Sequence, residues 1–133
     1  MYNIVIYPNT ISPWFSQVYA GLFELNATGN VEVTISPRFP HGDLVDAGSL
    51  ALDVTEQRSG RKLRILIDLG DNSCFQTPHV TDCFDVIAKK SFLRHEIDQL
   101  PQLQRSKVIP YGVNFNCGSP TIPILRLFAN HHL

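Results

Sequence analysis

The stretch MYNIVIYPNTISPWFSQVYAGLFELNATGNVEVTI, residues 1–35, decides the fold class. Its short apolar run Ile4–Tyr7 predicts a central strand buried on both faces, as in a parallel sheet with helices above and below. Ser12 can cap a following helix, whose apolar residues recur at helical spacing to about residue 25. The alternating, β-branched run Val31–Ile35 predicts a second strand. This order of strand, helix and strand indicates an α/β domain with a right-handed crossover.

Beyond residue 35 the sequence predicts a loop, a hairpin and two more strands. Residues 36–48 are rich in proline and glycine and read as a long loop. Residues 50–69, from Leu50 to Leu69, predict a β-hairpin insertion that turns around Ser59-Gly60, because glycine supplies the positive φ of such turns. A helix over residues 43–57 is the alternative. Asp82–Ser91 and Lys107–Ile109 predict the last strands, with a polar helix or turn in residues 92–103 and Pro101 near its end.

Length and composition indicate one globular domain, because 133 residues with 44% hydrophobic content can form one core but not two ordinary domains. The net charge of −1 hides an asymmetry: residues 1–57 hold one basic and six acidic residues, and residues 58–133 hold ten basic and six acidic residues. We interpret the basic residues as a solvated face. Nucleic-acid binding is not expected, since no basic stripe is interleaved with aromatic residues.

The sequence also predicts a compartment. It contains no run of about 18 apolar residues that could span a membrane, and its first residues lack the features of a secretory signal. The three cysteines, Cys74, Cys83 and Cys117, are an odd number and fit reduced thiols better than a disulfide framework. We therefore expect a cytoplasmic protein.

The clearest polar cluster is the segment Asp68-Leu-Gly-Asp71-Asn72, placed where open α/β sheets bind ligands. Two interpretations remain open. Asp71 and Asn72 either contact a ligand or satisfy amide groups of their own loop. A metal-dependent hydrolase that uses Asp68 and Asp71 is a weaker alternative, because no partner ligands are recognisable. Cys74, His79 and Cys83 match no zinc spacing, so no metal site is expected.

The turn between the first strand and the first helix is a second candidate. It contains Asn9 and Ser12, and the amino terminus of a helix can hold an anion or a hydroxylated ligand. The turn has no glycine of the phosphate-binding kind. Ser12 as a simple helix cap is the alternative.

Three motifs together resemble glycosyltransferases of the two-Rossmann-domain (GT-B) architecture. They are the strand that ends in Ile-Asp-Leu-Gly-Asp71, the segment Asp82-Cys-Phe-Asp-Val-Ile-Ala-Lys-Lys-Ser91, and Val108-Ile-Pro-Tyr-Gly-Val113. The resemblance covers roughly residues 1–115 and concerns the amino-terminal domain of such enzymes. It implies a Rossmann-like, three-layer domain with a mainly parallel sheet.

The resemblance also implies a function. The amino-terminal domain of such enzymes binds the sugar or glycan acceptor, and the carboxyl-terminal domain binds the nucleotide sugar. By position, the cleft between the domains would be lined by Asn9, Ser12, Asp71, Asn72, Lys89, Lys90 and Ser91. The catalytic residues are not assigned. Residues 116–133 would be a tail or the start of a missing second domain, so we expect the chain to be inactive alone and to bind no cofactor itself.

A non-enzymatic α/β module that binds a ligand or a partner is the main alternative. The length of the natural reading frame would separate the two hypotheses, because a transferase needs a second domain or a second subunit. If that domain is missing, the apolar residues 124–128 would be exposed, which predicts a homodimer.

Overall fold

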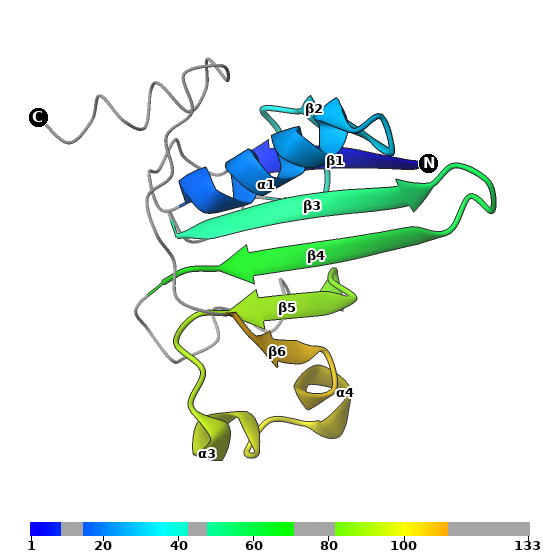
Figure 1. Cartoon of the computed structure of the whole chain (residues 1–133). Coiled ribbons are helices and arrows are strands. Elements are labelled where there is room, and N and C mark those ends of the chain that lie inside the picture. The colour runs from blue at the N-terminus through cyan, green and yellow to red at the C-terminus, as the bar shows by residue number, and fades with distance from the viewer. Residues whose placement is uncertain (9–14, 43–47, 71–81, 112–133) are drawn as a thin grey trace, which may run out of the picture.

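Six strands form one mixed sheet in the order β2-β1-β3-β4-β5-β6 (Figure 1). The computed structural model describes residues 1–8, 15–42, 48–70 and 82–111. The elements are β1 (Tyr2–Pro8), α1 (Ser16–Ala27), β2 (Val31–Ile35), β3 (Ser49–Glu56), β4 (Lys62–Asp68), β5 (Val86–Lys89), α3 (Arg94–Ile97), α4 (Gln102–Arg105) and β6 (Val108–Pro110).

The first strand, helix and second strand are confirmed. β1 and β2 are parallel, with Ile4 opposite Val33, and α1 joins them and packs against β2. The α-helix begins at Ser16, later than predicted, and the predicted cap Ser12 lies outside the described residues. The helix ends at Ala27, and the chain then turns at Gly29, whose φ is 76°.

The predicted hairpin is confirmed as the antiparallel pair β3 and β4, and the alternative helix is wrong for residues 49–56. Gly60 has a φ of 70°, so the turn needs glycine there. The hairpin is not a lateral addition to the sheet. β3 pairs with β1 and β4 pairs with β5, so the two strands hold the middle of the sheet and β1 lies one position from the edge.

The last predicted strands are also confirmed. β5 pairs in parallel with β4 and β6, and Pro101 separates the two short helices α3 and α4 of the predicted polar segment. Three of the strand pairings described are parallel and two are antiparallel. The chain therefore has the predicted α/β character, in a mixed, mostly parallel sheet.

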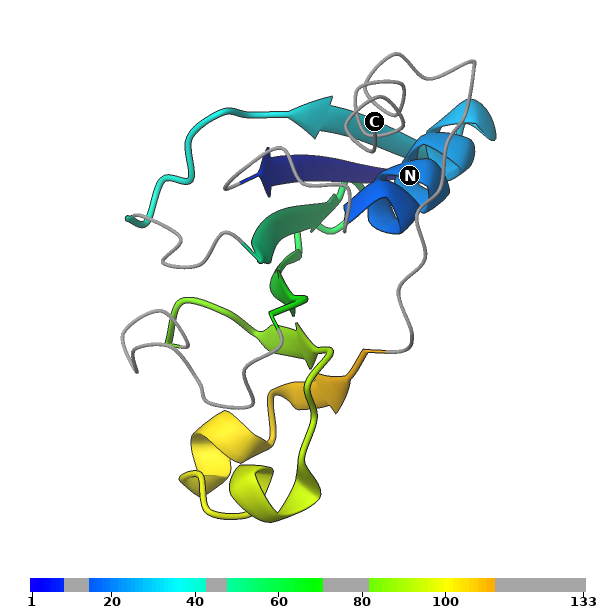
Figure 2. The same ribbon diagram turned by 90° about the vertical axis from the view of Figure 1, so that its left-hand side faces the viewer.

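Alternating side chains place two apolar clusters on opposite faces of the sheet. The first lies under α1 and combines helix residues with one face of β1, β3 and β4, as Phe15, Tyr19, Ile6, Leu50, Leu52 and Ile67. The second lies on the other face, where α3 contributes Ile97 to Ala51, Leu66, Phe84, Ile87 and Val108. In Figure 2, α1 lies beside β1 and β2 in the upper part of the view, and α3 and α4 lie near β5 and β6 in the lower part.

One part of the fold prediction is wrong. β1 was expected to be buried on both faces, but Ile4 and Ile6 are buried while Val5 and Tyr7 are partly exposed. The cause is that α1 covers one face only, and the opposite face of β1 adjoins polar partners on β3 and β4. Among the described residues, helices therefore cover different halves of the sheet on its two faces, instead of forming complete layers above and below.

Candidate functional site

Of the residues predicted to line a cleft, the structure describes Lys89, Lys90 and Ser91, while Asn9, Ser12, Asp71 and Asn72 lie outside the described residues. The three described residues lie at the carboxyl end of β5 and just after it. Open α/β sheets bind ligands beyond the carboxyl ends of their parallel strands. The candidate site therefore lies at this edge of the sheet.

The edge is organised by a buried ion pair between neighbouring strands. Asp68 ends β4 and lies directly opposite Lys89, which ends β5. The Lys89 Nζ donates to Asp68 Oδ2 at 2.8 Å, and the two side chains are 0% and 9% exposed. Because charges buried at this depth require compensation, each side chain fixes the position of the other.

Backbone and side-chain hydrogen bonds extend this pair into a cluster at the ends of β4 and β5. We call this cluster, formed by Asp68, Gly70, Lys89 and Ser91, the corner. Asp68 Oδ1 accepts from the Gly70 backbone N–H at 2.9 Å, and the Ser91 hydroxyl donates to the Gly70 carbonyl oxygen at 2.9 Å. The Lys90 N–H donates to the Asp68 carbonyl oxygen at 2.8 Å. The carboxyl ends of β4 and β5 are thus joined by the ion pair and by the hydrogen bonds of Lys90 to Asp68 and of Ser91 to Gly70.

The start of β3 packs tightly on the same corner. The Leu69 N–H donates to the Gly48 carbonyl oxygen at 2.9 Å. A Cβ on Gly48 would lie 3.1 Å from the Gly70 nitrogen and 3.2 Å from its Cα, both backbone atoms. Position 48 therefore requires glycine if the two backbones are to approach this closely.

This geometry refines the roles of the three predicted residues. The Lys89 ammonium lies in the interior and neutralises Asp68, whereas Lys90 and Ser91 are partly exposed at the rim. Two side chains bind Gly70: Asp68 accepts from its backbone N–H, and Ser91 donates to its carbonyl oxygen. Ligand binding by these residues remains a prediction.

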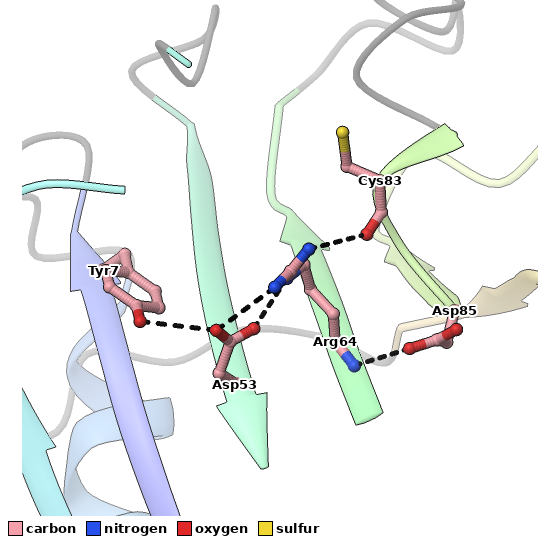
Figure 3. Close-up of polar contacts among 5 residues, drawn as sticks. All are labelled: Tyr7, Asp53, Arg64, Cys83 and Asp85. Carbon is pink, nitrogen blue, oxygen red and sulfur yellow. Dashed lines mark hydrogen bonds and ion pairs between the residues drawn. The ribbon is translucent and has the colours of Figure 1, made fainter. Parts of the chain in front are cut away.

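A second polar network, missed by the sequence analysis, lies on the sheet face opposite α1 (Figure 3). Arg64 Nε donates to Asp53 Oδ1 at 2.7 Å, and Arg64 Nη2 donates to Asp53 Oδ2 at 3.4 Å. The Tyr7 hydroxyl donates to Asp53 Oδ2 at 3.3 Å. Asp53 and Arg64 are direct neighbours across β3 and β4, and their side chains are about one quarter exposed (23% and 24%).

Arg64 also joins β4 to the segment that leads into β5. Its Nη1 donates to the Cys83 carbonyl oxygen at 3.4 Å, and its backbone N–H donates to Asp85 Oδ2 at 2.8 Å. The hydrogen bond to Asp53 raises the pKa of Arg64. The pKa of Tyr7 is raised as well, first by burial and then by the negative charge of Asp53.

Phe39, from the segment after β2, packs over this network. Its ring is stacked on Phe84, with centroids 5.6 Å apart, and meets Tyr7 edge to face at 5.4 Å. The guanidinium carbon of Arg64 lies 5.7 Å from the centre of the Phe39 ring, a cation–π distance. His41 meets the same ring edge to face.

Two basic residues therefore depart from the predicted solvated face, because Arg64 pairs with Asp53 and Lys89 pairs with Asp68. The described residues contain no group of His, Cys, Asp or Glu side chains that could hold a metal ion. Of the three cysteines, the structure describes Cys83, which is partly buried and forms no disulfide with another described residue. Asp68, the acidic candidate of the hydrolase hypothesis, is engaged by Lys89 and Gly70.

Searches of protein-family models, curated proteins and solved structures find no match to this chain. Within the described part of the chain, no helix has the length and apolar character needed to cross a membrane.

Proposed function

We propose that this chain is the acceptor-side domain of a glycosyltransferase, and that it binds a sugar or glycan at the carboxyl edge of β4 and β5. A second domain or subunit would bind the nucleotide sugar and complete the enzyme. The observation that carries the proposal is the corner formed by Asp68, Gly70, Lys89 and Ser91, which has the position of a ligand site in an open α/β sheet. The three motifs that resemble GT-B enzymes support the same function.

The chemistry of the rim suits a hydroxylated ligand. Lys90 supplies a cation and Ser91 a hydroxyl group beside a backbone turn, and sugar hydroxyls are recognised by such donors and acceptors. Asp68 is the acidic residue that the described structure places at this edge, and its carboxylate is occupied by Lys89 and Gly70. We therefore assign binding, rather than proton abstraction, to the described part of the edge.

The test is ligand-observed NMR of the whole chain with a panel of monosaccharides and oligosaccharides. We expect binding with a Kd on the order of 1 mM, as for a small ligand held by few polar groups. Lys90→Ala should weaken it. Lys62→Ala is the matched control, because Lys62 begins β4 at the opposite end of the same sheet. The proposal is wrong if no saccharide binds, or if both substitutions weaken binding equally.

A non-enzymatic binding module is the second candidate, and the occupied carboxylate of Asp68 favours it. The two functions differ in transfer. When saccharide, nucleotide sugar and a donor-binding domain are supplied together, a transferase half forms a glycoside, whereas a binding module retains the saccharide unchanged. Product analysis by mass spectrometry separates these outcomes.

A further inference from the structure

β5 is a short strand whose placement decides which lysine is buried. It has four residues, and its buried apolar residues Ile87 and Ala88 belong to the clusters on opposite faces of the sheet, so their pattern carries little information about register. Lys89 is buried against Asp68, while the adjacent Lys90 is partly exposed. Because both side chains end in an ammonium group, the chemistry of the pair alone does not select Lys89.

The backbone ladder does not select it either. Lys90 and Ile87 donate their N–H groups to carbonyl oxygens of Asp68 and Lys107, and any non-proline residue could do so. Side chains must therefore distinguish one placement of β5 from another. At the carboxyl end, such contacts are made by the Asp68–Lys89 pair itself and by the Ser91 hydroxyl, which donates to the Gly70 carbonyl oxygen.

The amino end of β5 has a contact that depends on one side chain. The Asp85 N–H donates to the Arg64 carbonyl oxygen at 2.9 Å, and Asp85 Oδ2 accepts from the Arg64 N–H at 2.8 Å. The neighbours of Asp85 are Phe84 and Val86, whose side chains cannot accept a hydrogen bond. Residue 85 is thus the position at which β4 recognises the beginning of β5.

The Arg64 side chain strengthens the same junction. Its Nη1 holds the Cys83 carbonyl oxygen, and Asp53 fixes the guanidinium from the other side (Figure 3). Asp53 lies on β3, so the junction is tied to the centre of the sheet. Asp85 directly precedes β5 and is four residues from Lys89, the last residue of that strand.

We propose that Arg64 and Asp85 form a clamp that positions β5, and that this clamp is what keeps Lys89 buried against Asp68. Arg64 and Asp85 are positioning residues, since they act on the candidate site through β5. The inference does not depend on sugar binding. In this proposal, the polar network around Arg64 positions the Asp68–Lys89 pair at the other end of β5.

The test is amine labelling of the folded whole chain, with the labelling of each lysine measured by mass spectrometry. In the unsubstituted protein Lys89 should be labelled far more slowly than Lys90. Asp85→Ala should raise the ratio of Lys89 to Lys90 labelling, with Lys62 as the internal reference. Asp85→Asn is the conservative control, because an amide oxygen can still accept from the Arg64 N–H, and it should keep the ratio low.

Two further variants separate positioning from general loss of stability. Gly60→Ala strains the hairpin turn far from Lys89, and should lower stability while leaving the labelling ratio unchanged. Arg64→Met keeps the backbone contact to Asp85 but removes the contact to Cys83, so an intermediate ratio is expected even if Asp85→Ala fails to fold. An unchanged ratio in Arg64→Met and Asp85→Ala overturns the clamp, as does an equal rise in Gly60→Ala.

Discussion

Two ion pairs in the described sheet have nearly equal distances and very different surroundings. Asp68 and Lys89 are 2.8 Å apart, with side chains 9% and 0% exposed, whereas Asp53 and Arg64 are 2.7 Å apart, with side chains about a quarter exposed. Both pairs join neighbouring strands. Burial, rather than distance, should therefore set the cost of breaking each pair, because water can solvate a partly exposed charge that loses its partner but not one left in the interior.

The largest effect is expected at the buried pair. Lys89→Met leaves the Asp68 carboxylate buried without its ammonium partner, which should lower the free energy of unfolding by about 3–5 kcal/mol. Urea denaturation measures this loss. Adding Asp68→Asn should restore much of it, since asparagine is neutral and still accepts from the Gly70 N–H. A cost in Lys89→Met no greater than that of Arg64→Met would contradict the comparison.

The next effect concerns a buried group without charge. Burial raises the pKa of Tyr19 from 10.0 to about 12. The folded state thus holds the phenolic proton more tightly than the unfolded state does. The resulting contribution of Tyr19 to the free energy of unfolding is complete below pH 10 and is lost as the pH rises from 10 to about 12. The loss should be roughly 2–3 kcal/mol, at about 1.4 kcal/mol for each pKa unit.

Denaturation at a series of alkaline pH values checks this by giving the slope of the unfolding free energy against pH. Tyr19→Phe should lose most of this slope. Tyr7→Phe should also make the slope less steep, because burial and Asp53 raise the pKa of Tyr7 as well. If the slope is as steep in Tyr19→Phe as in the unsubstituted protein, the buried phenol is not its source.

The partly exposed pair of Asp53 and Arg64 should contribute less. A double-mutant cycle with Asp53→Asn and Arg64→Met should give a coupling free energy of about 1 kcal/mol, as for ion pairs that water can reach. This coupling should shrink as salt is added, since exposed charges are screened. The cost of Lys89→Met should change little over the same range of salt, and equal salt dependence at both sites would remove the distinction between them.

The sequence predicted local elements well, because each depends on nearby residues. Alternation marks Val31–Ile35, and a glycine with positive φ marks the hairpin turn. Sheet order depends on long-range pairing, which no local pattern states. The insertion of β3 between β1 and β4 was therefore not predictable, nor was the polar surface beside Val5 and Tyr7.

The candidate sites illustrate the same limit. A two-residue turn at Ser59-Gly60 would place Asp53 opposite Leu66. The actual loop spans residues 57–60, with Glu56 bonded to Arg61, and this shift of two residues brings Asp53 opposite Arg64. Asp53 and Arg64 are charged residues within otherwise β-forming runs, and this was a signal for the second network. Only the strand register, however, shows that the two residues are neighbours. Likewise, Lys89 became a buried residue only through its parallel pairing with Asp68.

The smallest effect on stability is expected at an uncharged contact on the edge of the sheet. Asn26, in α1, accepts from the Val33 N–H of β2 through its Oδ1 at 2.9 Å. β2 is an edge strand, and a free N–H there can pair with another chain. At the other edge β6 ends in Pro110, which has no N–H to offer. Asn26→Ala should lower the free energy of unfolding by only about 0.5 kcal/mol, because water replaces the lost acceptor.

Self-association should respond more than stability does, since Asn26→Ala frees the middle of the β2 edge. Sedimentation velocity at increasing protein concentration should show more dimer or larger species in this variant than in the unsubstituted protein. Asn30→Ala is the matched control, because Asn30 precedes β2 and its side chain bonds to Thr28. Equal association in both variants would show that the contact of Asn26 with Val33 does not protect the β2 edge from pairing.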